Sequence, residues 1–349
     1  MRGFCVAAVL AAGIAMLASV GLAQHGPTSG PYKILKTARV GGEGGFDYIF
    51  ADVEGRRLYI PRRSGLTVFN LDTLEPAGGI DTVKSGGAAV DPKSHHGFST
   101  TKPITMWDSN TLQVIKTIDV NGGPDGIMFD SYNERIWILG HQPPYVTVID
   151  AKEGTVVGTV DLPGTAEQAT SDGKGTVYVN ISDKGGVAVV NAKTLAVTAN
   201  YDLSSKGIHG SGMAVDTKNH VLFAYYRDPK PVVVILNADN GNVLTTLPTG
   251  EGVDTVAFNP ATMEAISTEN AGSVTIIKEN SPTSFTIEQT LQTMAGAKTV
   301  ALDTKTGHLF TMTAEYGPPA ADAKPGPAGR PARGPMVPGS FSILMIGRP

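Results

Sequence analysis

The sequence predicts an all-β protein, a seven-bladed β-propeller with four antiparallel strands in each blade. Three observations lead to this prediction: a composition rich in turn-forming residues, a repeat of about 40 residues, and a constant order of short strands inside each repeat. The 349 residues include 42 glycines and 23 prolines, and only 17% of the residues are charged. Frequent turns and few surface helices follow from that balance.

An acidic or amide residue marks each repeat, and successive markers lie about 39 to 44 residues apart. A marker follows a short apolar segment such as GIMFD, and three further apolar segments come after it, as in RIWIL, YVTVID and TVVGTV. Four strands of about five residues, joined by Asp, Asn and Gly turns, are typical of a propeller blade. The seven markers are Asp52, Asp91, Asp130, Asp172, Asp216, Asn259 and Asp303.

The two ends of the chain are expected to complete the seventh blade together. The seventh repeat contains its first two strands and FSILMI (341–346), but no fourth strand follows before Pro349. The segment YKILKTARV (32–40) is a strand that lacks the rest of a repeat. Pairing it beside FSILMI would complete the blade and cover an exposed sheet edge.

The first 23 residues are typical of a secretory signal peptide, with Arg2 ahead of an apolar run and Ala23 at the expected cleavage point. An uncleaved membrane anchor is the alternative, because the run is near the length that spans a bilayer. Residues 24–349 then form a single propeller domain in a periplasmic or secreted protein, without cysteine and therefore without disulfides. Within the last blade, residues 317–339 are rich in Pro and Gly and are predicted to form a disordered loop.

The repeats resemble the YVTN family of β-propeller proteins, which includes the YncE-like secreted or periplasmic proteins. The resemblance lies in RLYIPRRSGLTVFNLDTLE, RIWILGHQPPYVTVIDAKEGTVVGTV and TVYVNISDKGGVAVVNAKTLAV, and it extends over nearly all of the chain after the signal. It implies the propeller fold and, for most members, a binding or scaffolding role. Propellers of similar architecture also include lactonases and electron-transfer subunits.

A single WD dipeptide, Trp107-Asp108, is the one sign of the related WD40-type repeat. The matching positions in other repeats are Asn70, Asp150, Asn191 and Asn237. Short polar side chains at strand ends hydrogen-bond to their own turns, which is sufficient to explain all of these residues.

Charge and motifs exclude several classes of function. The net charge of -4 gives no electrostatic footprint for nucleic acid and no basic stripe for an anionic membrane. No nucleotide-binding loop, zinc-protease motif or haem-attachment motif is present, so the sequence assigns no catalytic residue and no certain cofactor. A small molecule or a protein remains as the partner.

A first set of candidate ligand-binding residues comes from the innermost strands, which line the central channel of a propeller. The position five residues before each marker should lie at one channel mouth. Carboxylates gathered there would hold a hard cation such as Ca²⁺ or Mg²⁺, with a hydrated polar channel or an organic cation as the alternatives. The mouth positions are Asp47, Gly86, Asp125, Glu167, Ser211, Asp254 and Lys298, and the four carboxylates Asp47, Asp125, Glu167 and Asp254 are the metal-binding candidates.

A second set comes from the loops between the second and third strands, which should rise around the same mouth. Aromatic, guanidinium and carboxylate side chains are common at binding sites, although exposed loop tips are polar in any case. The residues selected are Arg62, His141, Tyr145, Asn180, Tyr226, Arg227 and Glu269.

Three functions stay open from the sequence. The first is a non-catalytic periplasmic or secreted propeller that binds a small molecule or protein partner at the channel mouth. The second is a metal-dependent hydrolase of the lactonase type, in which Glu167 and Asp254 hold a cation that activates water. The third is an accessory subunit of a periplasmic redox or cell-surface complex.

Overall fold

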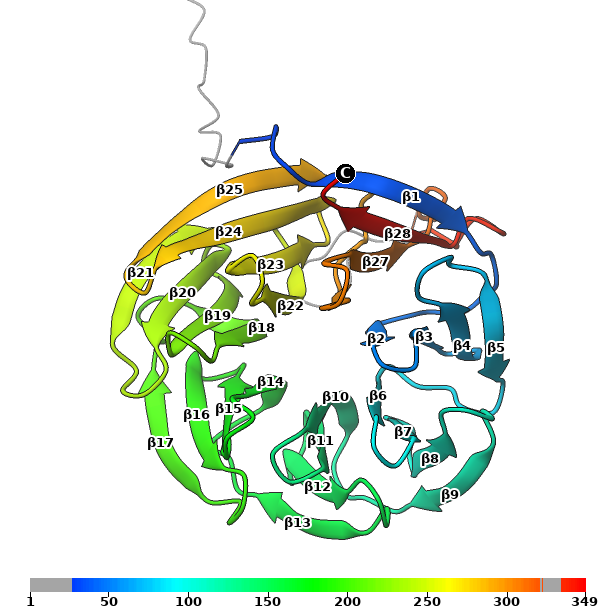
Figure 1. Cartoon of the computed structure of the whole chain (residues 1–349), viewed down its shortest axis with the longest axis horizontal. Coiled ribbons are helices and arrows are strands. Elements are labelled where there is room, and N and C mark those ends of the chain that lie inside the picture. The colour runs from blue at the N-terminus through cyan, green and yellow to red at the C-terminus, as the bar shows by residue number, and fades with distance from the viewer. Residues whose placement is uncertain (1–26, 321, 323–333) are drawn as a thin grey trace, which may run out of the picture.

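The computed structural model describes residues 27–320, 322 and 334–349, so the predicted signal peptide lies outside the described residues. Seven four-stranded antiparallel sheets follow one another around a central axis (Figure 1), which confirms the seven-bladed propeller. The innermost strands of blades 1 to 7 are β2 (Phe50–Asp52), β6 (Ala88–Asp91), β10 (Pro124–Asp130), β14 (Ala166–Ser171), β18 (Ile208–Asp216), β22 (Val253–Asn259) and β26 (Val300–Leu302).

The second and third strands of each blade form its buried middle, and nearly all of their apolar side chains are inaccessible to solvent. The second strands are β3 (Arg57–Arg62), β7 (His96–Ser99), β11 (Arg135–Gly140), β15 (Thr176–Ile181), β19 (Val221–Asp228), β23 (Glu264–Glu269) and β27 (Leu309–Thr313). The third strands are β4 (Gly65–Asn70), β8 (Ile104–Asp108), β12 (Val146–Asp150), β16 (Gly186–Asn191), β20 (Val232–Asn237), β24 (Ser273–Ser281) and β28 (Ser342–Gly347).

The outermost strand of each blade is largely exposed, and in several blades a buried residue ends it. In β13, for example, Val156 and Val157 are exposed whereas Val160 is buried. The outermost strands are β5 (Pro76–Ile80), β9 (Val114–Ile118), β13 (Val156–Val160), β17 (Val197–Asp202), β21 (Val243–Pro248), β25 (Ser284–Gln292) and β1 (Lys33–Arg39).

The N-terminal strand β1 closes the ring as expected. It pairs with β28 from Lys33 opposite Gly347 to Arg39 opposite Ser342, and so becomes the outermost strand of blade 7. A cluster of side chains, which we call the seam, fastens this joint to blade 6: the Tyr32 hydroxyl donates to Glu264 at 2.6 Å, and the Arg348 guanidinium bonds to the same carboxylate. The termini are thereby joined without a covalent link.

The core of the molecule lies between neighbouring blades. Buried apolar side chains form one cluster at each interface around the ring, from Tyr59 and Trp107 between blades 1 and 2 to Phe310 and Phe341 between blades 7 and 1. Trp107 explains the unusual second strand of blade 2. A Cβ atom at Gly97 would lie 2.2 Å from the Trp107 ring, so the strand gives up a side chain to admit the indole.

The markers of the repeat are turn residues. Asp52 Oδ1 accepts a hydrogen bond from Gly55 N, and each of the other six accepts one from the backbone N–H two residues later, as Asp91 does from Lys93. The residues aligned with Asp108 do the same at the ends of third strands, as the turn interpretation predicts. The repeat therefore reflects the same turn hydrogen bond, formed by a short polar side chain in every blade.

The ends of the predicted disordered loop are paired with each other. Gly317 N donates to Pro335 O at 2.9 Å, and Val337 N donates to Glu315 O at 2.9 Å. These contacts extend the β27–β28 hairpin outward at residues 317 and 335–337. Residues 321 and 323–333 of that loop lie outside the described residues.

Candidate functional site

The charged side chains at the start of the innermost strands form the candidate site, which we call the channel mouth. Asp125, Glu167 and Asp254 lie near the first residues of β10, β14 and β22, while Asp47 and Lys298 precede β2 and β26. These strands belong to separate blades arranged around the central axis (Figure 1), so the ring geometry brings together residues more than 200 positions apart, such as Asp47 and Lys298.

Lys298 links the carboxylates of blades 1 and 6. Its Nζ donates to Asp47 Oδ1 at 2.6 Å and also bonds to Asp254 Oδ2. Burial lowers the pKa of Lys298, but the charges of Asp254 and Asp47 outweigh it, so the pKa lies above its usual value. The ammonium is therefore charged at neutral pH.

Arg227 continues the network from blade 6 to blade 4. Its Nη2 atom lies 2.6 Å from Asp254 Oδ1 and 3.8 Å from Glu167 Oε1, and its Nε donates to Val253 O at 2.9 Å. Asp254 thus has a cation on each oxygen, and its side chain is only 8% exposed.

His141 carries the network on to blade 3. Its Nε2 lies 3.1 Å from Glu167 Oε2 and 3.5 Å from Asp125 Oδ2. The hydrogen bond to Glu167 raises the pKa of His141 above its usual value, with a smaller contribution from the charge of Asp125. Tyr48 completes this side of the mouth, because its hydroxyl donates to Asp125 Oδ2 at 3.3 Å.

The network is a horseshoe that is open at blade 2. It runs from Asp47 through six blades to Asp125, and the equivalent position of blade 2 is Gly86, which has no side chain. A Cβ atom at Gly86 would lie 3.7 Å from Asp125 Oδ1 and 3.8 Å from Asp47 Oδ2. Those two oxygens are the ones that Lys298, His141 and Tyr48 leave unused. Two carboxylate oxygens thus flank the opening, and none of the described residues places a cation between them.

The carboxylates beside the opening hold their protons more tightly than usual. Burial, and then the charge of Asp47, raises the pKa of Asp125 to about 6. Burial also raises the pKa of Asp47, against the lowering effect of Lys298. The Tyr48 pKa is raised well above its usual range by burial and by Asp125. Burial, more than the neighbouring charges, therefore disfavours ionisation at the open side of the mouth.

The remaining predicted site residues lie in the protein interior or are partly covered. Tyr226 packs in the cluster between blades 4 and 5, and Tyr145 packs against the one between blades 3 and 4. Arg62 donates to Gly41 O and Gly44 O and stacks 4.0 Å above the Phe341 ring. Of the second set, only His141 and Arg227 join the mouth network. The fully buried residues among those predicted are Arg62, Asn180, Ser211, Tyr226 and Glu269.

The predicted metal ligands do not converge on one point. Across residues 27–320, 322 and 334–349, no group of three or more His, Cys, Asp and Glu side chains has a geometry that could hold a metal ion. Lys298, Arg227 and His141 stand between the four carboxylates Asp47, Asp125, Glu167 and Asp254. The site as it stands is a network of ion pairs.

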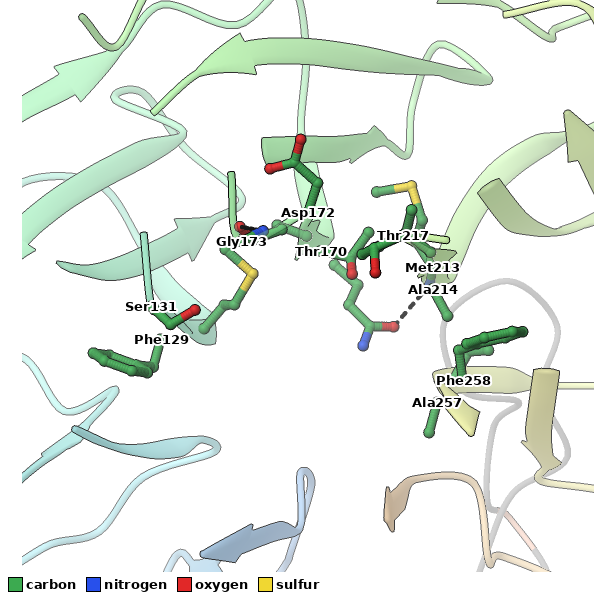
Figure 2. Close-up of a pocket in the computed structure, with 16 residues that line it drawn as sticks. Phe129, Ser131, Thr170, Asp172, Gly173, Met213, Ala214, Thr217, Ala257 and Phe258 are labelled. Carbon is green, nitrogen blue, oxygen red and sulfur yellow. Dashed lines mark hydrogen bonds between the residues drawn. The ribbon is translucent and has the colours of Figure 1, made fainter. Parts of the chain in front are cut away.

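Two features of the channel were missed by the sequence analysis. Tyr48 follows Asp47 directly, yet only the fold shows that its hydroxyl reaches Asp125, 77 positions away. The second is a cavity of about 430 Å³ further along the channel (Figure 2), lined by strand residues of blades 3 to 6 that carry no charge pattern. Both features depend on how the blades are arranged in space, which the sequence pattern does not specify.

Comparison with known proteins supports the fold alone. No family model and no curated protein sequence matches the chain. A chain in a crystal structure of the mitotic checkpoint complex is similar, with a TM-score of 0.68 and 11% identity over 89% of this chain and 96% of that chain. A chain of Kuenenia stuttgartiensis hydrazine synthase has a TM-score of 0.65 and 14% identity over 76% of this chain and 91% of that chain.

No segment in the described part of the chain forms a helix with the length and hydropathy needed to span a bilayer.

Proposed function

We propose that this propeller is a non-catalytic binding protein whose ligand places an ammonium or guanidinium group at the open side of the channel mouth. The observation that carries the proposal is the gap at Gly86, where Asp47 Oδ2 and Asp125 Oδ1 face the same empty position. Elsewhere in the horseshoe the carboxylates have Lys298, Arg227 or His141 as partners. An added cation would complete the alternation of charge around the mouth.

The ligand group fits the gap by charge and by access. Asp47 and Asp125 expose 33% and 31% of their side chains, so both are reachable from solvent while partly desolvated. A charge-assisted hydrogen bond is stronger in such a setting than between fully exposed groups. The cation can come from a small amine or from a Lys or Arg side chain of a protein partner.

The hydrolase alternative lacks an observation of its own. It requires Glu167 and Asp254 as metal ligands, but Asp254 bonds to Lys298 and Arg227, and Glu167 bonds to His141. A metal would have to displace these cations.

We place the protein outside the cytoplasm, in the periplasm or secreted, on the basis of residues 1–23 and the resemblance to YncE-like propellers.

Calorimetric titration with amines tests the proposal. The probes are 1,5-diaminopentane, argininamide and a short peptide containing lysine, with uncharged 1,5-pentanediol as the control ligand. We expect at least one amine to bind and the diol not to bind, and which amine is preferred distinguishes a small molecule from a protein side chain. Asp125→Asn should weaken the binding about tenfold or more, because one of the two carboxylates at the gap is lost.

The matched control variant is Asp161→Asn, which makes the same charge change at an exposed aspartate outside the mouth. Its amine affinity should equal that of the unaltered protein. Equal loss in both variants would mean that only long-range charge is at work, and absence of amine binding would overturn the proposal. A rise in melting temperature with millimolar Ca²⁺ or Mg²⁺ that Asp125→Asn abolishes would instead identify the mouth as a metal site.

A further inference from the structure

The cavity in the channel is chemically distinct from the charged mouth. Its 430 Å³ lie within the usual range for small-molecule sites. It is lined by the innermost strands β10, β14, β18 and β22 and the turns that follow β10, β14 and β18 (Figure 2). The mouth residues Asp125, Glu167 and Asp254 precede the lining residues on the same strands and are not part of the lining.

Charge is nearly absent from this cavity. Asp172 is the one titratable side chain in its lining, and its Oδ1 accepts hydrogen bonds from Lys174 N at 2.7 Å and Thr176 N at 2.9 Å. That carboxylate is therefore engaged in its own turn. The cavity offers no cation for an anionic ligand and no second carboxylate for a cationic one.

The apolar residues of the lining direct most of their side chains into the clusters between blades. Figure 2 shows Phe129 of blade 3 and Phe258 of blade 6 on opposite sides, with both rings turned away from the cavity. The two rings pack against separate interblade clusters, and Met213 is buried in the cluster between blades 4 and 5. Met128, which also lines the cavity, is only half-buried.

The cavity also offers hydrogen-bonding groups. The four lining strands are the inner edges of their sheets and so present unpaired backbone N–H and C=O groups to the channel. Gln168 Oε1 accepts from one of them, Met213 N, at 2.9 Å, whereas Gln168 Nε2 donates to none of the described residues. Thr170 and Thr217 provide hydroxyl groups.

We propose that this cavity is a second ligand-binding site, for a small uncharged molecule that carries both hydrogen-bond donors and acceptors, such as a lactam. The nearly uncharged lining fits the absence of charge on such a molecule. The strand edges and Gln168 fit its donors and acceptors. This proposal is independent of the one for the mouth, because neither Asp47 nor Asp125 lines the cavity.

Methyl NMR of the methionines tests the proposal directly. The probe is quinolin-2-one, a planar uncharged lactam, and its charged counterpart is quinoline-4-carboxylate. We expect quinolin-2-one to shift the methyl signals of Met128 and Met213, which line the cavity, and to leave those of Met106 and Met345, which lie in the cores between other blades. The carboxylate should bind at least about tenfold more weakly.

Two variants of Thr170 separate filling of the cavity from general disturbance. Thr170→Trp places an indole in the cavity and should weaken quinolin-2-one binding about tenfold or more, whereas Thr170→Ser, which keeps the hydroxyl, should change it by less than about threefold. Melting temperatures and amine binding at the mouth show whether Thr170→Trp is folded. Binding that is equal in the two variants, absence of Met128 and Met213 shifts, or equal binding of the carboxylate would overturn the proposal.

Discussion

The seam and the channel mouth are built from the same kinds of side chain, yet the pKa of Glu264 at the seam and those of Asp47 and Asp125 at the mouth shift in opposite directions. At the seam, burial raises the pKa of Glu264, but hydrogen bonding with Glu288 and with the Tyr32 hydroxyl, together with the charge of Arg348, outweighs it, so the pKa is lowered. At the mouth, burial of Asp47 and Asp125 prevails and both pKa values are raised.

The difference lies in how completely each network is paired. Glu264 is fully buried and has a tyrosine and an arginine as partners, so its ionisation stabilises the fold. Asp125 is 31% exposed and faces Asp47 across Gly86 with no cation between them. Ionisation of Asp125 therefore costs folding free energy. The fully paired carboxylate at the seam stabilises the fold, whereas the incompletely paired carboxylates at the mouth leave charge that a ligand could neutralise.

The largest effect on stability is expected from a deletion that breaks the seam. Deletion of residues 24–40 removes β1 and Tyr32, exposes the edge of β28 and leaves Glu264 with fewer partners. We expect the unfolding free energy to fall by more than about 4 kcal/mol and the melting temperature by about 10 °C or more. Differential scanning calorimetry is the measurement.

Tyr32→Phe is the graded control for that deletion. It keeps β1 in place and removes only the hydroxyl that donates to Glu264, so we expect a loss of about 1–2 kcal/mol. A synthetic peptide of residues 27–40 should recover part of the stability of the deleted protein by binding to the open edge. A melt that the deletion leaves unchanged would show that the ring does not depend on β1.

A smaller effect is expected from removal of the central cation of the mouth. Lys298→Met leaves Asp47 and one oxygen of Asp254 without their ammonium partner in a partly buried site. We expect a loss of about 2–4 kcal/mol at pH 8, measured by urea unfolding. The pKa of Lys298 is raised, so the ammonium is charged from acid up to a pH of about 10. Its contribution, and the loss in the variant, should shrink in acid because Asp47 becomes protonated there.

Two controls identify the source of that loss. Lys298→Arg keeps the charge and should retain most of the stability. Lys93→Met breaks the exposed ion pair with Glu134 and should leave stability unchanged, because exposed pairs contribute little. A Lys298→Met loss that stays constant from pH 8 to pH 4 would point to lost packing rather than to the carboxylates.

The sequence predicted the fold and the ring positions well because both depend on periodic features. The turn residues recur at each marker, and five residues before a marker is the same place on every innermost strand, which located Asp47, Asp125, Glu167, Asp254 and Lys298. The pairing of β1 with β28 followed from a missing strand and a surplus one.

The loop positions were less predictable because the second strands extend further than expected. In β19, Tyr226 and Arg227 are both strand residues, and successive strand side chains point to opposite faces. Tyr226 consequently packs in the core, while Arg227 reaches Asp254. Glu269 is likewise the last residue of β23 and is fully buried, where Ser267 and Ser273 donate to it. A sequence pattern gives residue spacing, but burial depends on where pairing stops.

The smallest effect on stability, and the sharpest test of the comparison, comes from Asp125→Asn. The pKa of Asp125 in the folded protein, about 6, lies above the usual value of 3.8. Between these pH values, Asp125 is therefore protonated in a larger fraction of folded molecules than of unfolded ones. The stability of the unaltered protein should therefore fall as the pH rises from about 4 to about 6. Asparagine does not ionise, and it can still accept the hydrogen bond from Tyr48.

We therefore expect Asp125→Asn to match the unaltered protein at pH 4 and to be more stable by about 1–2 kcal/mol at pH 8, measured by urea unfolding across that range. Asp161→Asn, at an exposed position, should give no such crossing. Amine affinity of the unaltered protein should decline below pH 6 over the same interval, because protonated Asp125 cannot pair with a cation. If Asp125→Asn were instead less stable at pH 8, the contacts with His141 would outweigh the cost of ionisation, and the mouth would be a closed structural network like the seam.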